Sequence, residues 1–317
     1  MRIVSLLPSA TEILFALGFD REVLGVSHEC DFPAQARDKR VVVHSRIPHG
    51  LTSEEIDKVV REYVSRGESL YSVDAAALRE LAPDMIVTQD LCHVCSASPD
   101  DLAAVLADFE PRPQVLSLNP QNLQDVWRDI ALVGKGTFRV NEAQHVIDEI
   151  TASIAALSQT VEKIPARPRV AFLEWLDPFY VGGHWVPEMI ALAAGEDVFG
   201  RVATPSFRVT ARDIIAVAPD IIVVSPCGYS AEQGRAEYCS MKFSDEWNSI
   251  PAVRSGRVYA FEANSYASRP GPRLAIGVEA LAKIFHPALA VSNEAASGFT
   301  PISTKSAVSA NASASAF

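Results

Sequence analysis

The chain carries one pattern of apolar and polar positions twice. In each copy an apolar-periodic segment ends at Ala-Pro-Asp and a run of mainly β-branched residues follows, as LAPDMIV at 81–87 and VAPDIIVV at 217–224. Proline cannot continue a helix, and each apolar run is too short to form one. Each copy therefore predicts a helix, a turn and a buried strand of a parallel sheet.

Short apolar runs alternate with helical patterns on both sides of one longer segment, residues 138–164, which keeps a helical period without Gly or Pro. This alternation predicts an α/β fold with two αβ lobes, each built on a parallel sheet, joined by one long rigid helix. We expect an N-terminal lobe at 1–137, the connecting helix at 138–164 and a C-terminal lobe at 165–287. Residues 288–317 are rich in Ala and Ser, and we expect them to be disordered.

Composition and charge narrow the class of partner. With 317 residues, of which 48% are apolar, the chain can fill two cores. The net charge of -11, spread without long blocks of like charge, argues against nucleic acid and anionic membranes as partners. The sequence contains no run of 18 uncharged apolar residues, so it predicts no membrane-spanning helix. We expect the partner to be a small-molecule ligand.

The amino-terminal segment and the cysteines bear on location. IVSLLPSATEILFALGF is interrupted by Pro8 and Glu12, so it predicts a strand and a helix of the fold rather than a signal peptide. Five cysteines, an odd number in a long chain, favour reduced thiols. As written, the chain is expected to be cytoplasmic, and periplasmic or extracellular only if a leader was removed.

Polar loops follow the predicted strands at their carboxyl ends, where open parallel sheets bind ligands. These loops contain His28, Glu29, Cys30, Asp31, Gln89, Asp90, Cys92, His93, Cys95, Glu174, Trp175, His184, Trp185, Cys227, Tyr229, Tyr266 and Arg269. We expect Asp31, Gln89, Asp90 and Glu174 to offer polar groups to the ligand.

The motif CHVC at 92–95 has the spacing with which two sulfurs reach one tetrahedral metal. The remaining ligands of a zinc or cobalt ion would come from Cys30, His28, His93 or His184, provided that the loops converge. A redox-active thiol pair and plain loop thiols are the alternatives. A thiol enzyme acting through Cys92 is a further one, but no Ser-His-Asp order, Walker loop or GxGxxG is present, so we expect no catalytic activity.

Two further loops predict ligand contacts. GGHWVPE at 182–188 has glycines that allow close approach of the backbone, followed by His184 and Trp185. Together with Trp175 it would form a flat apolar platform, whereas the alternative is a tight loop whose indole covers the core. Arg269, in a loop stiffened by Pro and Gly, suits an anionic or amide-bearing ligand, or is simply solvated.

Seven stretches of the chain share their order with one known family: RIVSLLPSATEILFALGF, GVSHECDFP, LAPDMIVTQDLC, the helical connector, FLEWLDPFYVGGHWVPEMIALAAG, VAPDIIVVSPCG and SRPGPRLAIGVEALA. Together they resemble the cobalamin-binding branch of the periplasmic-binding-protein family, which serves ABC importers of iron chelates and vitamins. The resemblance covers residues 1–287. It implies a class III two-lobed fold, a cobalamin or related corrinoid or metal chelate held in a cleft between the lobes, and an ABC transporter as partner.

The resemblance also implies particular contacts. The ligand positions of the family fall on Asp31, Phe32, the loop 45–49, Gln89, the loop 175–179 with Trp175 and Phe179, Ser206 or Phe207, Tyr266 and Arg269. Where cobalamin receptors place tryptophans, this chain has Gln89 and Ser206 or Phe207. The acids that dock a transporter fall on Ala76 and Arg212, with Glu54, Glu55 and Asp213 nearby. The HECD and CHVC loops resemble a subgroup without a signal peptide, for which a cytosolic metal-binding role is the alternative.

Overall fold

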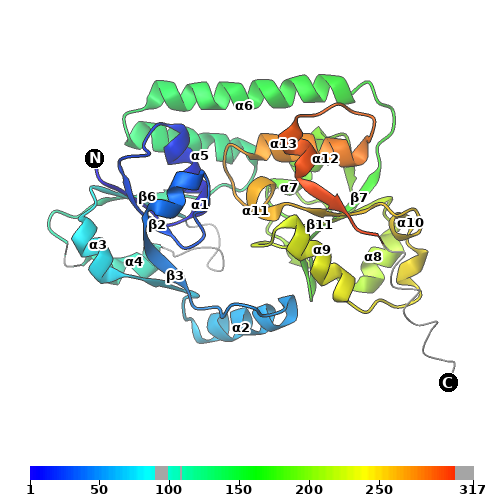
Figure 1. The fold of residues 1–317 in the computed structure, drawn as a ribbon, viewed down its shortest axis with the longest axis horizontal. Helices are drawn as coiled ribbons and strands as arrows, with labels where there is room; N and C mark the ends of the chain where they lie inside the picture. Colours follow the sequence, from blue (N-terminus) through cyan, green and yellow to red (C-terminus); the bar gives the residue numbers. More distant parts are fainter. Residues whose placement is uncertain (90–98, 108, 304–317) are drawn as a thin grey trace. The chain divides into compact units, whose positions relative to one another are not determined.

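A computed structural model of the chain describes residues 1–89, 99–107 and 109–303. It divides into two compact units (Figure 1). The first contains Met1–Ile150 and Pro270–Pro272, and the second contains Thr151–Arg269 and the residues from Arg273 onward. The chain passes from one unit to the other inside helix α6, Val140–Val161, which lies within the predicted range of 138–164.

The first unit contains a six-stranded sheet in the order β4-β3-β2-β1-β5-β6 within the described residues. Its strands are β1 (Ile3–Ser5), β2 (Val23–Ser27), β3 (Arg40–Ser45), β4 (Tyr71–Val73), β5 (Met85–Gln89) and β6 (Gln114–Leu118). Its helices are α1 (Pro8–Ala16), η1 (Ala34–Asp38), α2 (Ser53–Arg66), α3 (Ala75–Leu81), α4 (Pro99–Leu106) and α5 (Leu123–Gly136). All neighbouring strands are parallel except β3 and β4. The amino-terminal segment thus forms a central strand and a buried helix of the fold, as predicted.

Within its described residues, up to 303, the second unit contains a seven-stranded sheet in the order β10-β8-β7-β11-β12-β13, with β9 paired to β7. Its strands are β7 (Arg169–Leu176), β8 (Phe179–Val181), β9 (Glu196–Asp197), β10 (Phe207–Arg208), β11 (Ile221–Val224), β12 (Val258–Phe261) and β13 (Phe299–Pro301). Its helices are α7 (Val186–Leu192), α8 (Ala211–Val217), α9 (Ala231–Ser240), η2 (Trp247–Ser249), α10 (Pro251–Arg254), α11 (Ala263–Tyr266), α12 (Leu274–Phe285) and α13 (Asn293–Ser297). Strands β7, β11 and β12 are parallel, whereas β8, β10 and β13 add antiparallel edges.

The sequence repeat folds twice into the same local structure. Both Ala-Pro-Asp motifs end a helix, α3 or α8, with the alanine in a left-handed conformation at φ 40° or 46°. The aspartate then binds the backbone where a neighbouring strand starts. Asp84 Oδ2 accepts from the amide of Arg2, just before β1, at 2.7 Å, and Asp220 Oδ2 accepts from that of Arg169, the first residue of β7, at 2.9 Å. These bonds satisfy backbone groups where the parallel strands begin. The repeated sequence therefore specifies how a central strand starts in each sheet.

The expectation that the chain is disordered from residue 288 is wrong for 288–303. Strand β13 pairs with β12, and Ala295 of α13 and Ile302 are almost completely buried, at 0% and 2% exposure. An edge strand gains its hydrogen bonds from its neighbour, so a segment of low hydrophobicity can still be ordered. Residues 304–317 lie outside the described part of the chain.

Candidate functional site

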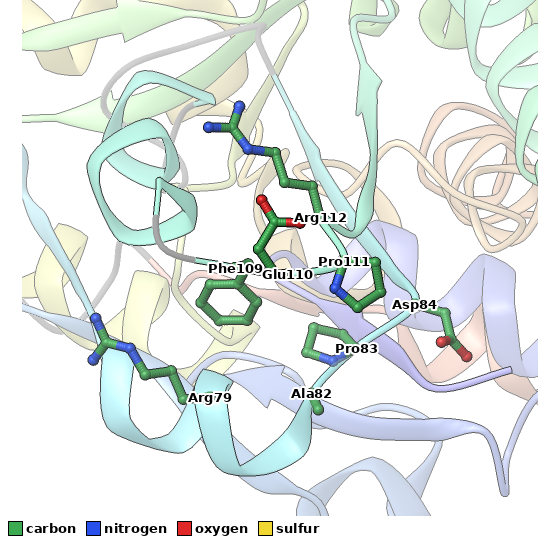
Figure 2. Close-up of a pocket in the computed structure, with 8 residues that line it drawn as sticks. All are labelled: Arg79, Ala82, Pro83, Asp84, Phe109, Glu110, Pro111 and Arg112. Carbon is green, nitrogen blue, oxygen red and sulfur yellow. The ribbon is translucent and has the colours of Figure 1, made fainter.

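A pocket of about 420 Å³ opens in the first unit at the amino ends of β5 and β6 (Figure 2). Residues 82–84 and 109–112 line it together with Arg79, and Pro83, Pro111 and Phe109 lie together in its wall. Ligands of open parallel sheets bind at the opposite edge, where the strands end. The functional site is therefore expected at the carboxyl ends of the strands.

Polar side chains end three strands of the first sheet. β2 ends at Ser27, β3 at Ser45 and β5 at Gln89, and these strands are parallel members of one sheet. Their carboxyl ends consequently share one edge. Asp31 and Phe32 follow β2 closely; Asp31 is half-buried, and Phe32 is 40% exposed. Gln89 is only 5% exposed.

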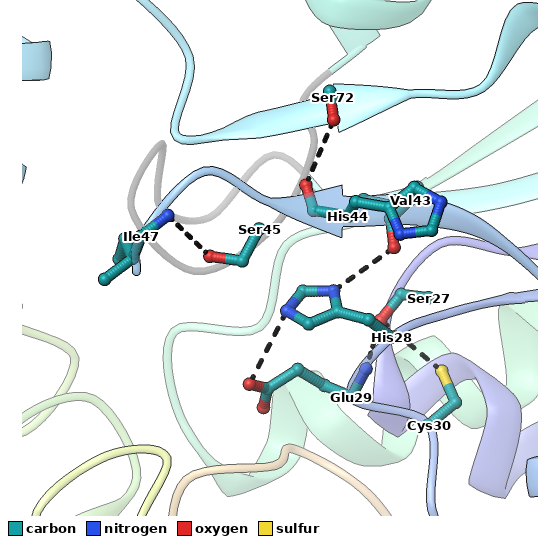
Figure 3. A network of polar contacts seen from close by, with 9 residues as sticks. All are labelled: Ser27, His28, Glu29, Cys30, Val43, His44, Ser45, Ile47 and Ser72. Carbon is teal, nitrogen blue, oxygen red and sulfur yellow. Dashed lines mark hydrogen bonds and ion pairs between the residues drawn. The ribbon is translucent and has the colours of Figure 1, made fainter. Parts of the chain in front are cut away.

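His28 is held at this edge by the neighbouring strand (Figure 3). Its Nδ1 lies 3.2 Å from the carbonyl oxygen of Val43 in β3, and its Nε2 lies 3.7 Å from Oε1 of Glu29. The Tyr71 ring of β4 lies 6.1 Å away, tilted by 44°. Burial lowers the pKa of His28, against the opposing effect of the Glu29 carboxylate. The imidazole is therefore neutral at neutral pH.

Cys30, expected to bind a metal, points away from this imidazole into the polar layer under the edge (Figure 3). It is 4% exposed, Thr11 Oγ1 lies 3.0 Å from its sulfur, and the thiol donates to Ser27 Oγ at 3.6 Å. Thr11, at the start of α1, also donates to Ser5 Oγ at 2.8 Å. This network ties α1 to the ends of β1 and β2. The described structure gives the thiol a packing role, and the sequence offered no sign of these hydroxyl partners.

The remaining members of the predicted metal set, Cys92, His93 and Cys95, lie outside the described residues, as does Asp90. Within the described ranges, no group of three or more His, Cys, Asp and Glu side chains is arranged to hold a metal ion.

In the second unit, an aromatic pair stands at the corresponding edge. Trp175 near the end of β7 and Tyr229 after β11 meet edge to face, with ring centroids 5.7 Å apart and planes at 71°. Both residues are half-buried. Burial, followed by a hydrogen bond to Glu237, raises the pKa of Tyr229. The pair offers a rigid and partly exposed aromatic surface. Although both residues belong to the predicted loops, only the adjacency of β7 and β11 brings them together.

The GGHWVPE loop is held against residues 203–206. The amide of Gly183 donates to Oε2 of Glu174 at 3.3 Å, and that of His184 donates to the carbonyl of Thr204 at 2.7 Å. His184 has φ 51°, an uncommon conformation for a residue with a side chain. Burial lowers its pKa. This loop therefore presents a second neutral histidine in a constrained backbone.

The predicted platform of two indoles is wrong. Trp185 is 5% exposed and its Nε1 donates to the carbonyl of Ala267 at 2.7 Å, so this indole supports α7 from inside the unit. Phe179 is also a core residue, 8% exposed and stacked on Trp247 at 5.4 Å between centroids. The hairpin of β7 and β8 buries Phe179, and this hairpin was not expected from the sequence.

The other predicted contacts are less exposed than expected. Tyr266 and Arg269 are each 7% exposed, and the Tyr266 hydroxyl donates to Glu294 of α13 at 3.3 Å. The ring of Phe207 is covered by the guanidinium of Arg201, 4.2 Å from its centroid. Phe207 is half-buried, whereas Tyr266 and Arg269 offer little surface to a ligand in this conformation.

Two of the acids near the expected docking positions cap the amino ends of helices. Glu55 completes a capping box with Thr52 at the start of α2, and Asp213 completes another with Thr210 at the start of α8. Ala76 and Arg212, where docking acids were expected, are the second residues of α3 and α8, so the two positions match in the repeat.

Two αβ units with ligand-type groups at the carboxyl edges of their sheets define the class of two-lobed substrate-binding proteins. The family described as periplasmic binding protein matches residues 3–264, and the chain belongs to it. Among the helices of the described chain, none is sufficiently long and apolar to span a membrane.

Relatives and solved structures agree with this class. The chain is 26% identical to the uncharacterized ABC transporter substrate-binding lipoprotein YvrC of Bacillus subtilis, over 90% of this chain and 80% of that protein. It is 22% identical to a vitamin B12-binding protein of Vibrio parahaemolyticus, over 86% and 84%. The fold is similar to that of a periplasmic heme-binding protein from Pseudomonas aeruginosa, with TM-score 0.70, 16% identity and coverage of 92% and 95%.

These comparisons establish a periplasmic binding protein, and one of its relatives is named as the substrate-binding lipoprotein of an ABC transporter. They give the expected cytoplasmic location no support, because one relative is named a lipoprotein and the family is periplasmic.

Proposed function

We propose that this protein is the ligand receptor of an ABC importer, acting in the periplasm or at the cell surface, and that its ligand is cobalamin or a related corrinoid. The Trp175–Tyr229 pair is the observation that carries the choice of ligand. A corrin is a flat macrocycle fringed with amide groups, and a partly exposed aromatic pair supplies an apolar surface for such a ring. The similarity to vitamin B12-binding proteins along most of the chain supports the same choice.

Polar groups at the two carboxyl edges suit the amide fringe. Asp31 of the first unit and Glu174 of the second offer half-buried carboxylate groups, and Phe32 adds an exposed ring. Gln89 is only 5% exposed, so its amide would have to become more exposed before it could reach a ligand. Hydrogen bonds to ligand amides fix orientation, whereas ring contacts supply most of the buried apolar area. We retain these residues and His184 as contacts, and assign Phe179 and Trp185 to the core.

Binding is tested by isothermal titration of the purified protein with cyanocobalamin, dicyanocobinamide and iron(III) protoporphyrin IX. We expect one site per chain with micromolar or tighter affinity for the corrinoids. Trp175→Ala should weaken corrinoid binding about tenfold or more, which corresponds to about 1.4 kcal/mol or more for an aromatic contact.

Phe138→Ala is the matched control, because Phe138 is 86% exposed in the turn between α5 and α6 and far in sequence from the strand ends. It should bind corrinoids like the unaltered protein. Binding of the porphyrin alone would replace the corrinoid by haem as the ligand. Absence of binding to all three compounds would refute the proposal.

A further inference from the structure

The ring of His28 is oriented by its backbone partner. A carbonyl oxygen can only accept, so the 3.2 Å contact to the carbonyl of Val43 places the proton of the neutral imidazole on Nδ1. The lone pair is then on Nε2. Histidines that bind metals through one nitrogen usually donate the other N–H to a carbonyl or carboxylate, which fixes the tautomer and the ring orientation. His28 has this arrangement before any ligand arrives.

Nε2 of His28 makes no hydrogen bond within the described chain. The side chain is 22% exposed, and Oε1 of Glu29, at 3.7 Å, is beyond hydrogen-bond distance. In the neutral tautomer that the Val43 carbonyl selects, Nε2 carries the lone pair. The ring lies directly after β2, at the carboxyl edge, and the Tyr71 ring beside it restricts its movement. This is a pre-oriented nitrogen donor where the ligand is expected.

Two other histidines lie near enough to His28 to act on its charge. His44 and His49 both lower the pKa of His28, and both are exposed. Neither ring is held by a hydrogen bond in the described residues, so each would lose more side-chain entropy on binding a metal. The orientation by Val43 singles out His28.

We propose that His28 binds the central metal of the ligand through Nε2, which makes the ligand a planar chelate with an exchangeable axial position. This proposal rests on the proposed function and narrows its substrate class. A bond forms between the metal and Nε2 as the bond between the metal and an axial water breaks; the water leaves and no electron is transferred. A chelate whose axial positions are both firmly occupied would lack this contact.

Absorption spectroscopy tests the axial bond separately from binding. Diaquacobinamide and iron(III) protoporphyrin IX are titrated into the full-length protein, and their visible bands are followed while calorimetry measures binding. We expect the band positions of nitrogen coordination with at least one of the two probes. His28→Gln should abolish this band shift and weaken binding of that probe at least tenfold, since loss even of a supporting partner costs 10- to 100-fold.

Three controls make the result specific. His44→Gln, a near neighbour, and His145→Gln, on the exposed face of α6, should retain the band shift. In His28→Ala, added imidazole should restore the band shift, which would show that the ligand site around position 28 remains folded. A band shift that survives in His28→Gln overturns the inference. Binding without any band shift overturns it too but leaves the proposed function intact, whereas no binding of any probe refutes both.

Discussion

Replacing Asp129 by asparagine should make the protein progressively more stable, relative to the unaltered protein, as the pH rises from 5 to 8. Asp129 lies in α5 with 8% exposure, and its Oδ2 is buried with no hydrogen-bond partner in the described structure. Burial, and then the carboxylate of Asp125, raise its pKa from 3.8 to about 7. The backbone amide of Asn119 donates to the carboxylate and offsets only part of this rise.

The direction of the pH dependence of stability follows from the proton that Asp129 binds. The folded state holds the Asp129 proton more tightly than the unfolded state, so its stabilising contribution is complete below pH 4 and is lost as pH rises from about 4 to 7. At 1.36 kcal/mol for each pKa unit, the rise of about 3 units sets an upper limit of about 4 kcal/mol above pH 7. Of this loss, about 2–3 kcal/mol should fall between pH 5 and pH 8.

The assay is urea unfolding at pH 5, 6, 7 and 8, followed through the intrinsic tryptophan fluorescence of the protein, to which Trp127 in the same helix contributes. The asparagine amide will itself lack a partner, but this cost does not vary with pH and cancels in the difference between pH 5 and pH 8. Glu149→Gln, on the exposed surface of α6, is the control and should change stability by less than about 0.5 kcal/mol at every pH. A stability difference between Asp129→Asn and the unaltered protein that stays constant from pH 5 to pH 8 would show that Asp129 is ionised throughout.

Three further predictions concern the packing of the protein. Gly183→Ala should lower the free energy of unfolding by about 1–3 kcal/mol, because the new Cβ would lie 2.3 Å from the backbone nitrogen of Ser206 in the facing loop. Gly136→Ala is its control: the nearest atom to its new Cβ is 3.4 Å away, so this change should be neutral or stabilising by up to about 1 kcal/mol. Trp185→Phe should cost about 1–3 kcal/mol, since a buried carbonyl loses its donor. In native protein, iodoacetamide should modify the exposed Cys227 well before the buried Cys30, as followed by peptide mass spectrometry.

Each of these has a clear contrary outcome. Equal urea midpoints for Gly183→Ala and Gly136→Ala would mean that the facing loop moves freely. An unchanged midpoint for Trp185→Phe would mean that water replaces the indole donor. Equal alkylation rates for Cys30 and Cys227 would mean that the thiol network at α1 opens readily, and the metal-binding interpretation of Cys30 would regain support.

The sequence predicted the elements that local chemistry specifies. The Ala-Pro-Asp repeats gave both helix ends and both following strands, because proline, a short turn and a β-branched run act within a few residues. The connecting helix was predicted within three residues at each end, since its period is unbroken. The two αβ units follow from these elements. The family came instead from the resemblance of seven stretches of the chain to one known family, and the family match confirms it.

The sequence predicted which loops contain the site. It did not predict which side chains in these loops are buried. Trp175 and Trp185 both follow a predicted strand of the C-terminal lobe, so the sequence does not distinguish them. The indole of Trp185 is hydrogen-bonded inside the unit, whereas that of Trp175 is half-buried beside Tyr229. Cys30 follows a strand as a ligand would, but hydroxyl groups from α1 and β2 enclose it. Such differences depend on partners far away in the chain.

What the sequence alone determined is therefore the succession of strands and helices, and the loops in which ligand contacts lie, because both depend on short-range periodicity and turn residues. Tertiary structure decided that β13 completes an edge, that Phe179 belongs to the core, and that His28 is oriented by Val43. Each of these results from pairing between strands, and strand pairing brings together residues whose separation in sequence carries no signal of their contact.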